Sequence, residues 1–138
     1  SFRKSLTKSL AGDASEHDIQ SAFVKMLSQT GRPEVDVSFA IPNAGKRSFA
    51  VAAMLKAEGF RTGMPDWCLP VARQGFNALW IEFKRPKLKP TQEQARIHAL
   101  LEEHGGKVLV CTSAVAAVDA VMDYLSVSGT PRPDSGPD

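Results

Sequence analysis

Glu82 and Lys84 lie two residues apart in the otherwise apolar segment Trp80-Ile81-Glu82-Phe83-Lys84. This segment predicts a strand, in which alternate side chains share a face, so Glu82 and Lys84 point the same way as Trp80. Charged groups are costly to bury unless they are paired or hold an ion. Such a pair is either a surface ion pair at the edge of a sheet or part of a reactive site.

Asp66 favours the reactive site. It follows the turn Gly63-Met64-Pro65 and begins a predicted strand that runs antiparallel to the strand of Glu82. The two carboxylates can then converge with the main-chain carbonyl of Phe83, and such oxygen ligands suit Mg²⁺ or Mn²⁺. Lys84 would position an attacking water and stabilise negative charge on a phosphate. The alternative for Asp66 is an ordinary turn aspartate after proline.

The hydrophobic pattern predicts eight elements around these residues, in the order α-β-α-β-β-α-β-α. Helices are expected over 15–31, 47–58, 91–104 and 113–125, and strands over 35–41, 67–71, 78–84 and 107–111. The last strand is continuously apolar, which is typical of a strand buried on both faces. The order indicates an α/β fold with a mixed central β-sheet flanked by α-helices.

Length and composition indicate one globular domain. The chain has 138 residues, of which 43% are hydrophobic and 23% charged, which excludes collagen-like, wholly disordered and disulfide-scaffold proteins. Residues 1–13 are expected to be a flexible basic arm, 14–127 the folded domain, and 128–138 a disordered Pro- and Gly-rich tail. The net charge of +2 does not by itself indicate a nucleic-acid partner.

Several function classes have no support in the sequence. There is no apolar run of about 20 residues, so we expect no membrane partner. No glycine-rich phosphate loop is present, so we expect no nucleotide cofactor. The three histidines form no metal-ligand motif with the two cysteines, which are expected to be isolated buried thiols; these residues are His17, His98, His104, Cys68 and Cys111. The N-terminus lacks the apolar segment of a signal peptide, which favours an intracellular protein.

Positive charge is concentrated just after the Glu82 strand. Lys84, Arg85, Lys87 and Lys89 fall within six positions without an acidic residue, and two prolines hold the segment extended. Such a run is either a solvated surface or a set of DNA phosphate contacts, which would give sequence-independent and salt-sensitive affinity.

An ordered set of short motifs extends this pattern over about residues 15–125. The set comprises Ile41-Pro42-Asn43, Gly59-Phe60, Gly63-Met64-Pro65-Asp66, Ile81-Glu82-Phe83-Lys84 and Gln94. It resembles the VRR-NUC branch of the PD-(D/E)xK nucleases.

The resemblance implies a restriction-endonuclease-like core and Mg²⁺-dependent hydrolysis of DNA phosphodiesters, with Mn²⁺ able to substitute. Short stand-alone members occur in phages and bacteria, which would place the protein in the cytoplasm of a bacterium or of a phage-infected host. Such members are expected to form homodimers and to cut branched DNA such as four-way (Holliday) junctions. A flap or general nuclease and a non-cleaving branched-DNA-binding module are the alternatives.

The resemblance also assigns roles to individual residues. Asp66 and Glu82 match the metal ligands, joined by the carbonyl of Phe83, and Lys84 matches the active-site lysine. Glu16 matches an acidic residue on the first helix that would complete the metal site, although an acid is favoured in a first helical turn in any case.

Gln94 matches a glutamine of the catalytic site, although it also fits a capping box with Thr91. DNA contacts are expected from Gln20, one turn after Glu16, and from basic and polar residues on either side of the site: Asn43, Lys46, Arg47, Arg85, Lys87 and Lys89.

Overall fold

The computed structural model describes residues 15–42 and 48–126. The predicted arm over 1–13 and tail over 128–138 lie outside the described residues. The same is true of three expected DNA contacts, Asn43, Lys46 and Arg47.

A four-stranded mixed sheet forms the centre of the fold, in the order β1-β2-β3-β4. The strands are β1 (Phe39–Ala40), β2 (Trp67–Leu69), β3 (Leu79–Phe83) and β4 (Lys107–Cys111). Strand β2 is antiparallel to both β1 and β3, whereas β3 and β4 are parallel. The parallel pair follows from the crossover through a helix, as the element order predicts.

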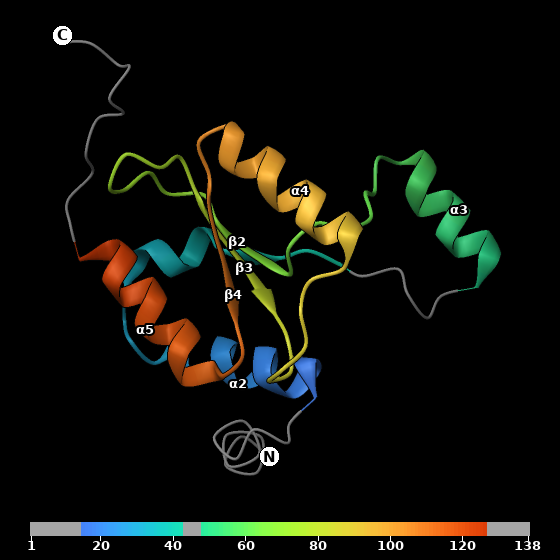
Figure 1. Cartoon of the computed structure of the whole chain (residues 1–138). Coiled ribbons are helices and arrows are strands. Elements are labelled where there is room, and N and C mark those ends of the chain that lie inside the picture. The colour runs from blue at the N-terminus through green and yellow to red at the C-terminus, as the bar shows by residue number, and fades with distance from the viewer. Residues whose placement is uncertain (1–14, 43–47, 127–138) are drawn as a thin grey trace, which may run out of the picture.

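Helices cover both faces of this sheet (Figure 1). Helices α2 (Glu16–Ser28) and α5 (Ala114–Leu125) pack on one face, and α4 (Gln92–Glu103) lies on the other. Helix α3 (Phe49–Ala57) lies to one side of this body. The predicted α/β class with a mixed sheet between helices is therefore confirmed.

Strand alternation divides β3 between two environments. Leu79, Ile81 and Phe83 are fully buried in the hydrophobic core, together with apolar residues of α2 and α5. The intervening side chains therefore face the other side, where α4 lies. This arrangement places Glu82 between the sheet and a helix.

Two features of the strand prediction are wrong. Residues Pro33–Val37 form a 3₁₀-helix rather than the first half of a strand, and only Phe39–Ala40 pair in the sheet. Proline in the first turn favours the helical form, while the apolar alternation around Asp36 imitates a strand. Strand β4 is not buried on both faces, because it lies at the sheet edge and its Val110 is 43% exposed.

The remaining boundaries agree closely with the sequence. Strand β2 ends at Leu69 rather than at residue 71, since Pro70 has no N–H for the ladder. Capping boxes at Ser15 and Thr91 start α2 and α4 as predicted. None of the helices in 15–42 and 48–126 is long and apolar enough to cross a membrane.

Candidate active site

Asp66 and Glu82 lie side by side on neighbouring strands. The pairing of Trp67 with Ile81, continued by one residue, sets Asp66 opposite Glu82. The main-chain N–H of Asp66 donates to the Ile81 carbonyl at 3.0 Å, and its Oδ2 accepts the N–H of Phe83 at 2.7 Å. The predicted convergence of two carboxylates thus follows from the antiparallel register.

A close approach between the loop before β2 and helix α4 holds Asp66 in place. Gly63 has φ +83°, and a Cβ there would lie 2.9 Å from Cγ of Glu93 and 3.0 Å from its carbonyl oxygen. Only glycine allows this contact without displacement of helix backbone. The loop therefore packs on the first turn of α4 and delivers Asp66 to the site.

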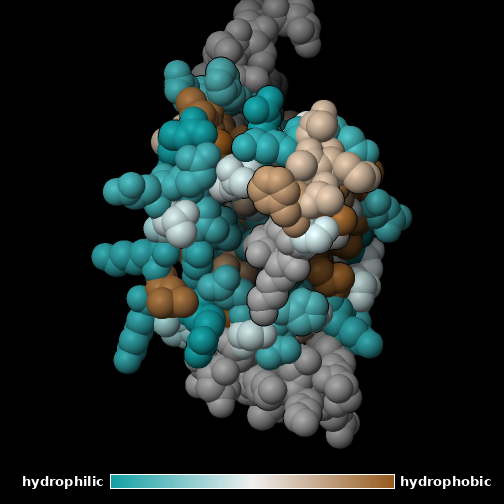
Figure 2. Space-filling view, turned by 90° about the vertical axis from the view of Figure 1, so that its right-hand side faces the viewer, coloured by the Kyte–Doolittle hydropathy of each residue, from teal (hydrophilic) through white to brown (hydrophobic). Residues whose placement is uncertain are grey.

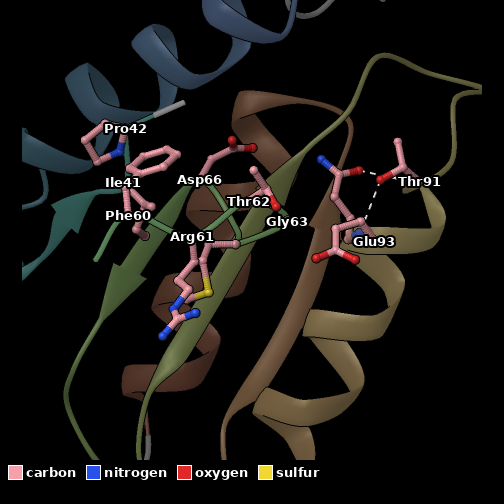
Figure 3. A pocket seen from close by; sticks show the side chains of 11 residues that line it. Ile41, Pro42, Phe60, Arg61, Thr62, Gly63, Asp66, Thr91 and Glu93 are labelled. Carbon is pink, nitrogen blue, oxygen red and sulfur yellow. Dashed lines mark hydrogen bonds between the residues drawn. The ribbon is translucent and has the colours of Figure 1, made fainter. Parts of the chain in front are cut away.

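A cleft of about 160 Å³ opens beside Asp66. Figure 3 shows Asp66 and Arg61 on the strand and loop side, with Thr91 and Glu93 on the side of α4. Gln94 also lines the cleft. A ligand entering it would lie next to the carboxylate of Asp66.

The environment of Glu82 is unfavourable to a lone negative charge. Its side chain is 2% exposed. Burial and then the neighbouring Asp66 carboxyl raise the pKa of Glu82 to about 9, against the opposing effect of the Lys84 charge. A divalent cation between the two carboxylates would offset their repulsion, so the residues fit a metal site.

The protein offers this ion few ligands. In the part of the chain that the structure describes, no group of three or more His, Cys, Asp or Glu side chains is arranged to hold a metal ion. Two carboxylates and the main-chain carbonyl of Phe83 would leave further positions to water and substrate. Such partial coordination is typical of Mg²⁺.

Lys84 is 8% exposed, and β3 lies between β2 and β4. The interpretation of Glu82 and Lys84 as an ion pair at an exposed sheet edge is therefore wrong. The positive charge of Lys84 lowers the pKa of Glu82, which indicates that it acts on the carboxylates. A buried lysine beside two acids is arranged for charge stabilisation rather than for solubility.

Gln94 makes the capping contact that the sequence predicts, and it also reaches Glu82. Its Oε1 accepts the Thr91 N–H at 2.9 Å, which completes the capping box. Its Nε2 donates to Oε2 of Glu82 at 3.4 Å. The cap therefore fixes the amide so that its donor end faces the carboxylate.

His98 is the site residue that sequence reasoning missed. It is buried, and its Nε2 lies 3.2 Å from Oε1 of Glu82. The available signal is its position four residues after Gln94, because residues four apart share a helix face.

Helix α2 brings two further predicted residues to the same end of the sheet. Glu16 accepts the main-chain N–H of Arg85 through Oε2 at 3.3 Å, and its charge also raises the pKa of Glu82. Gln20 donates from Nε2 to the carbonyl of Asp66 at 3.4 Å. Both side chains therefore border the site, each bonded to main chain.

The basic run after β3 forms an exposed turn. Leu88 donates its N–H to the carbonyl of Arg85 at 3.1 Å, which closes a turn over Pro86 and Lys87. Lys87 has φ +72°, as the third position of a type II turn requires. Arg85, Lys87 and Lys89 are exposed, whereas Lys84 is buried, as Glu82 is.

Comparisons with known proteins identify the family and support the fold. Residues 13–115 match the VRR-NUC domain family. A solved structure described as a VRR_NUC domain protein superimposes with a TM-score of 0.71 at 22% identity, over 83% of this chain and 91% of that chain. The comparison with curated proteins found no match.

Proposed function

This chain belongs to the VRR-NUC family, a nuclease-type domain, and we propose that it is a Mg²⁺-dependent endonuclease that hydrolyses phosphodiester bonds in branched DNA such as four-way junctions. The observation that carries the proposal is the buried carboxyl of Glu82 next to the carboxyl of Asp66, with Lys84 buried on the same face of the strand. A buried carboxyl next to a second carboxyl is costly, and a catalytic cation between the two would explain why they are kept.

Each residue of the site has a separate role in the proposed reaction. Asp66, Glu82 and the Phe83 carbonyl would hold Mg²⁺, with Mn²⁺ able to replace it and Glu16 at the border of the site. When bound, the ion would supply Lewis-acid activation of water and of the scissile phosphate. Lys84 orients the attacking water and stabilises the negative charge that develops on the phosphate, an effect strengthened by its burial.

The exposed turn after β3 supports a DNA partner. Arg85, Lys87 and Lys89 lie on solvent-exposed backbone that leads directly out of the active site. They would bind phosphates flanking the cleavage point, independently of sequence. Gln20, bonded to the Asp66 carbonyl, would contact the strand from the side of α2.

Helix α3 supports a homodimer. Its sequence FAVAAMLKA has one charged residue, and none of its nine residues is buried by the described part of the chain. Phe49 is 93% exposed and Met54 63%, and Figure 2 shows apolar side chains gathered on the side where α3 lies. By contrast, the apolar stripe of α5 is buried in the core. We therefore assign the dimer contact to α3 packed on α3 of a second copy, which suits a two-fold substrate.

The test is strand scission on a labelled four-way junction, with flap and linear duplexes alongside, in Mg²⁺, Mn²⁺ or EDTA. We expect metal-dependent cuts in the junction that are lost in Glu82→Ala. Equal cutting of linear duplex would contradict the preference for branched DNA. Junction binding without scission in either metal would indicate a non-cleaving binding module instead.

A further inference from the structure

Helix α4 contacts both carboxylate oxygens of Glu82. Gln94 Nε2 lies 3.4 Å from Oε2, and His98 Nε2 lies 3.2 Å from Oε1. The two residues are one helical turn apart and so reach the carboxylate from one face. Helix α4 therefore supplies one contact to each of the two carboxylate oxygens of Glu82.

The two contacts differ in how they are anchored. The Gln94 amide is tied to the Thr91 N–H and also serves the helix cap. No such local role explains His98, whose ring nitrogen is directed at a residue sixteen positions away. A buried histidine kept only for packing would not need to place its nitrogen on an acidic residue of the site.

Histidine has a donor of the right kind for this contact. A neutral ring with its hydrogen on Nε2 donates to Oε1 and adds no net charge. The contact therefore orients the carboxylate without competing with a cation for its charge.

We infer that His98 is a positioning residue: it donates from Nε2 to Oε1 of Glu82 and holds that carboxylate in the orientation that binds the divalent cation. The inference rests on the proposed function, because it assumes that Glu82 is a metal ligand. Partners of this kind alter metal affinity by about 10- to 100-fold when they are removed. They act through the ligand and do not touch the substrate.

The test compares two substitutions in the full chain. His98→Leu removes the donor and keeps an apolar side chain in the buried position, whereas His98→Gln keeps an N–H near the place of Nε2. Mn²⁺ binding without DNA is followed by the loss of the free-ion signal in electron paramagnetic resonance. We expect about 10- to 100-fold weaker binding in His98→Leu and near wild-type binding in His98→Gln. His104→Leu, at the exposed C-terminal end of α4, is the matched control and should bind as wild type does.

Thermal unfolding in EDTA separates positioning from a structural role. Unchanged Mn²⁺ affinity in His98→Leu would overturn the inference while leaving the proposed function intact. Equal loss of affinity in both His98 variants, accompanied by equal loss of melting temperature in EDTA, would also overturn it, since packing would then explain the effect. Absence of Mn²⁺ binding in the wild type would overturn the metal dependence in the proposed function, and with it this inference.

Discussion

The carboxylate of Asp66 accepts the main-chain N–H of Phe83, the residue that directly follows Glu82, at 2.7 Å. This distance is at the short end of the range for N–H···O hydrogen bonds. The hydrogen bond ties the side chain of Asp66 to the strand that carries Glu82 and Lys84. The spacing of the acids in the site is therefore set by β3 itself and not only by the loop that precedes β2.

Asp66 substitutions should separate this structural bond from catalysis. Asp66→Asn keeps an oxygen that can accept the Phe83 N–H but removes the charge, whereas Asp66→Ala removes both. We expect both variants to lose at least about 100-fold in cleavage rate. Only Asp66→Ala should lose about 1–3 kcal/mol in the free energy of unfolding, because the buried N–H of Phe83 then has no acceptor.

Denaturant unfolding and junction cleavage measure these two effects. DNA binding at low salt serves as the control and should survive in both variants, since the proposed phosphate contacts lie elsewhere. Cleavage by Asp66→Asn at the wild-type rate would remove Asp66 from the metal site.

Glu82 should make the metal-free protein less stable as pH rises. Its pKa is raised from 4.5 to about 9, first by burial and then by Asp66, so the folded state holds a proton that the unfolded state releases. Stability should therefore fall between about pH 4.5 and 9, by at most about 1.4 kcal/mol per pH unit. Glu82→Gln, which cannot ionise, should escape this loss.

Melting temperatures of wild type and Glu82→Gln in EDTA, at pH 5 and at pH 8.5, check this prediction. The melting temperature of Glu82→Gln should rise relative to that of the wild type as pH rises. Mg²⁺ at 100 times its dissociation constant should add about 2.7 kcal/mol to the wild type at pH 8.5 and much less to Glu82→Gln. A pH-independent difference between the two proteins would show that Glu82 keeps an ordinary pKa.

The site residues on β3 could be predicted because strand alternation leaves no choice of face. Once Leu79, Ile81 and Phe83 are assigned to the core, Glu82 and Lys84 must share the other face. The meeting with Asp66 also follows from the sequence, because a turn between two antiparallel strands brings the start of one strand beside the end of the other. These parts of the site depend on local rules alone.

Other parts depend on tertiary packing. His98 contacts Glu82 only because of how α4 is rotated about its own axis when it packs on the sheet. Residue spacing does not predict that rotation. The error over residues 35–41 has a different cause. Alternation around Asp36 is compatible with both a strand and a short 3₁₀-helix, and Pro33 decides between them.

Lys87 should prove unfavourable for stability and favourable for DNA binding. It has φ +72° in a turn position that glycine would occupy without strain. Lys87→Gly should raise the free energy of unfolding by up to about 1 kcal/mol and weaken junction binding. Lys87→Gln, which removes the charge but keeps the strain, should weaken binding equally without the gain in stability.

Binding titrations over a range of salt concentrations test the Lys87 contact. In both variants the salt dependence of DNA binding should fall by the amount expected for about one phosphate contact. Unchanged affinity in both would assign Lys87 to a solvated turn. A gain of stability in Lys87→Gln equal to that in Lys87→Gly would show that charge repulsion, and not backbone strain, is the cost at this position.

Phe49→Asp should convert the proposed dimer to a monomer. Phe49 is the first residue of α3 after the Ser48 cap, a position where an acidic residue favours the helix, so the helix should stay intact. Two α3 helices packed together would bring the new carboxylates into an apolar contact, which is unfavourable.

Light scattering should give a dimeric mass for the wild type and a monomeric mass for the variant. Leu100→Glu, on the exposed surface of α4, is the control and should remain dimeric. A monomeric wild type at working concentration would contradict the dimer, and a dimeric Phe49→Asp would place the contact away from α3.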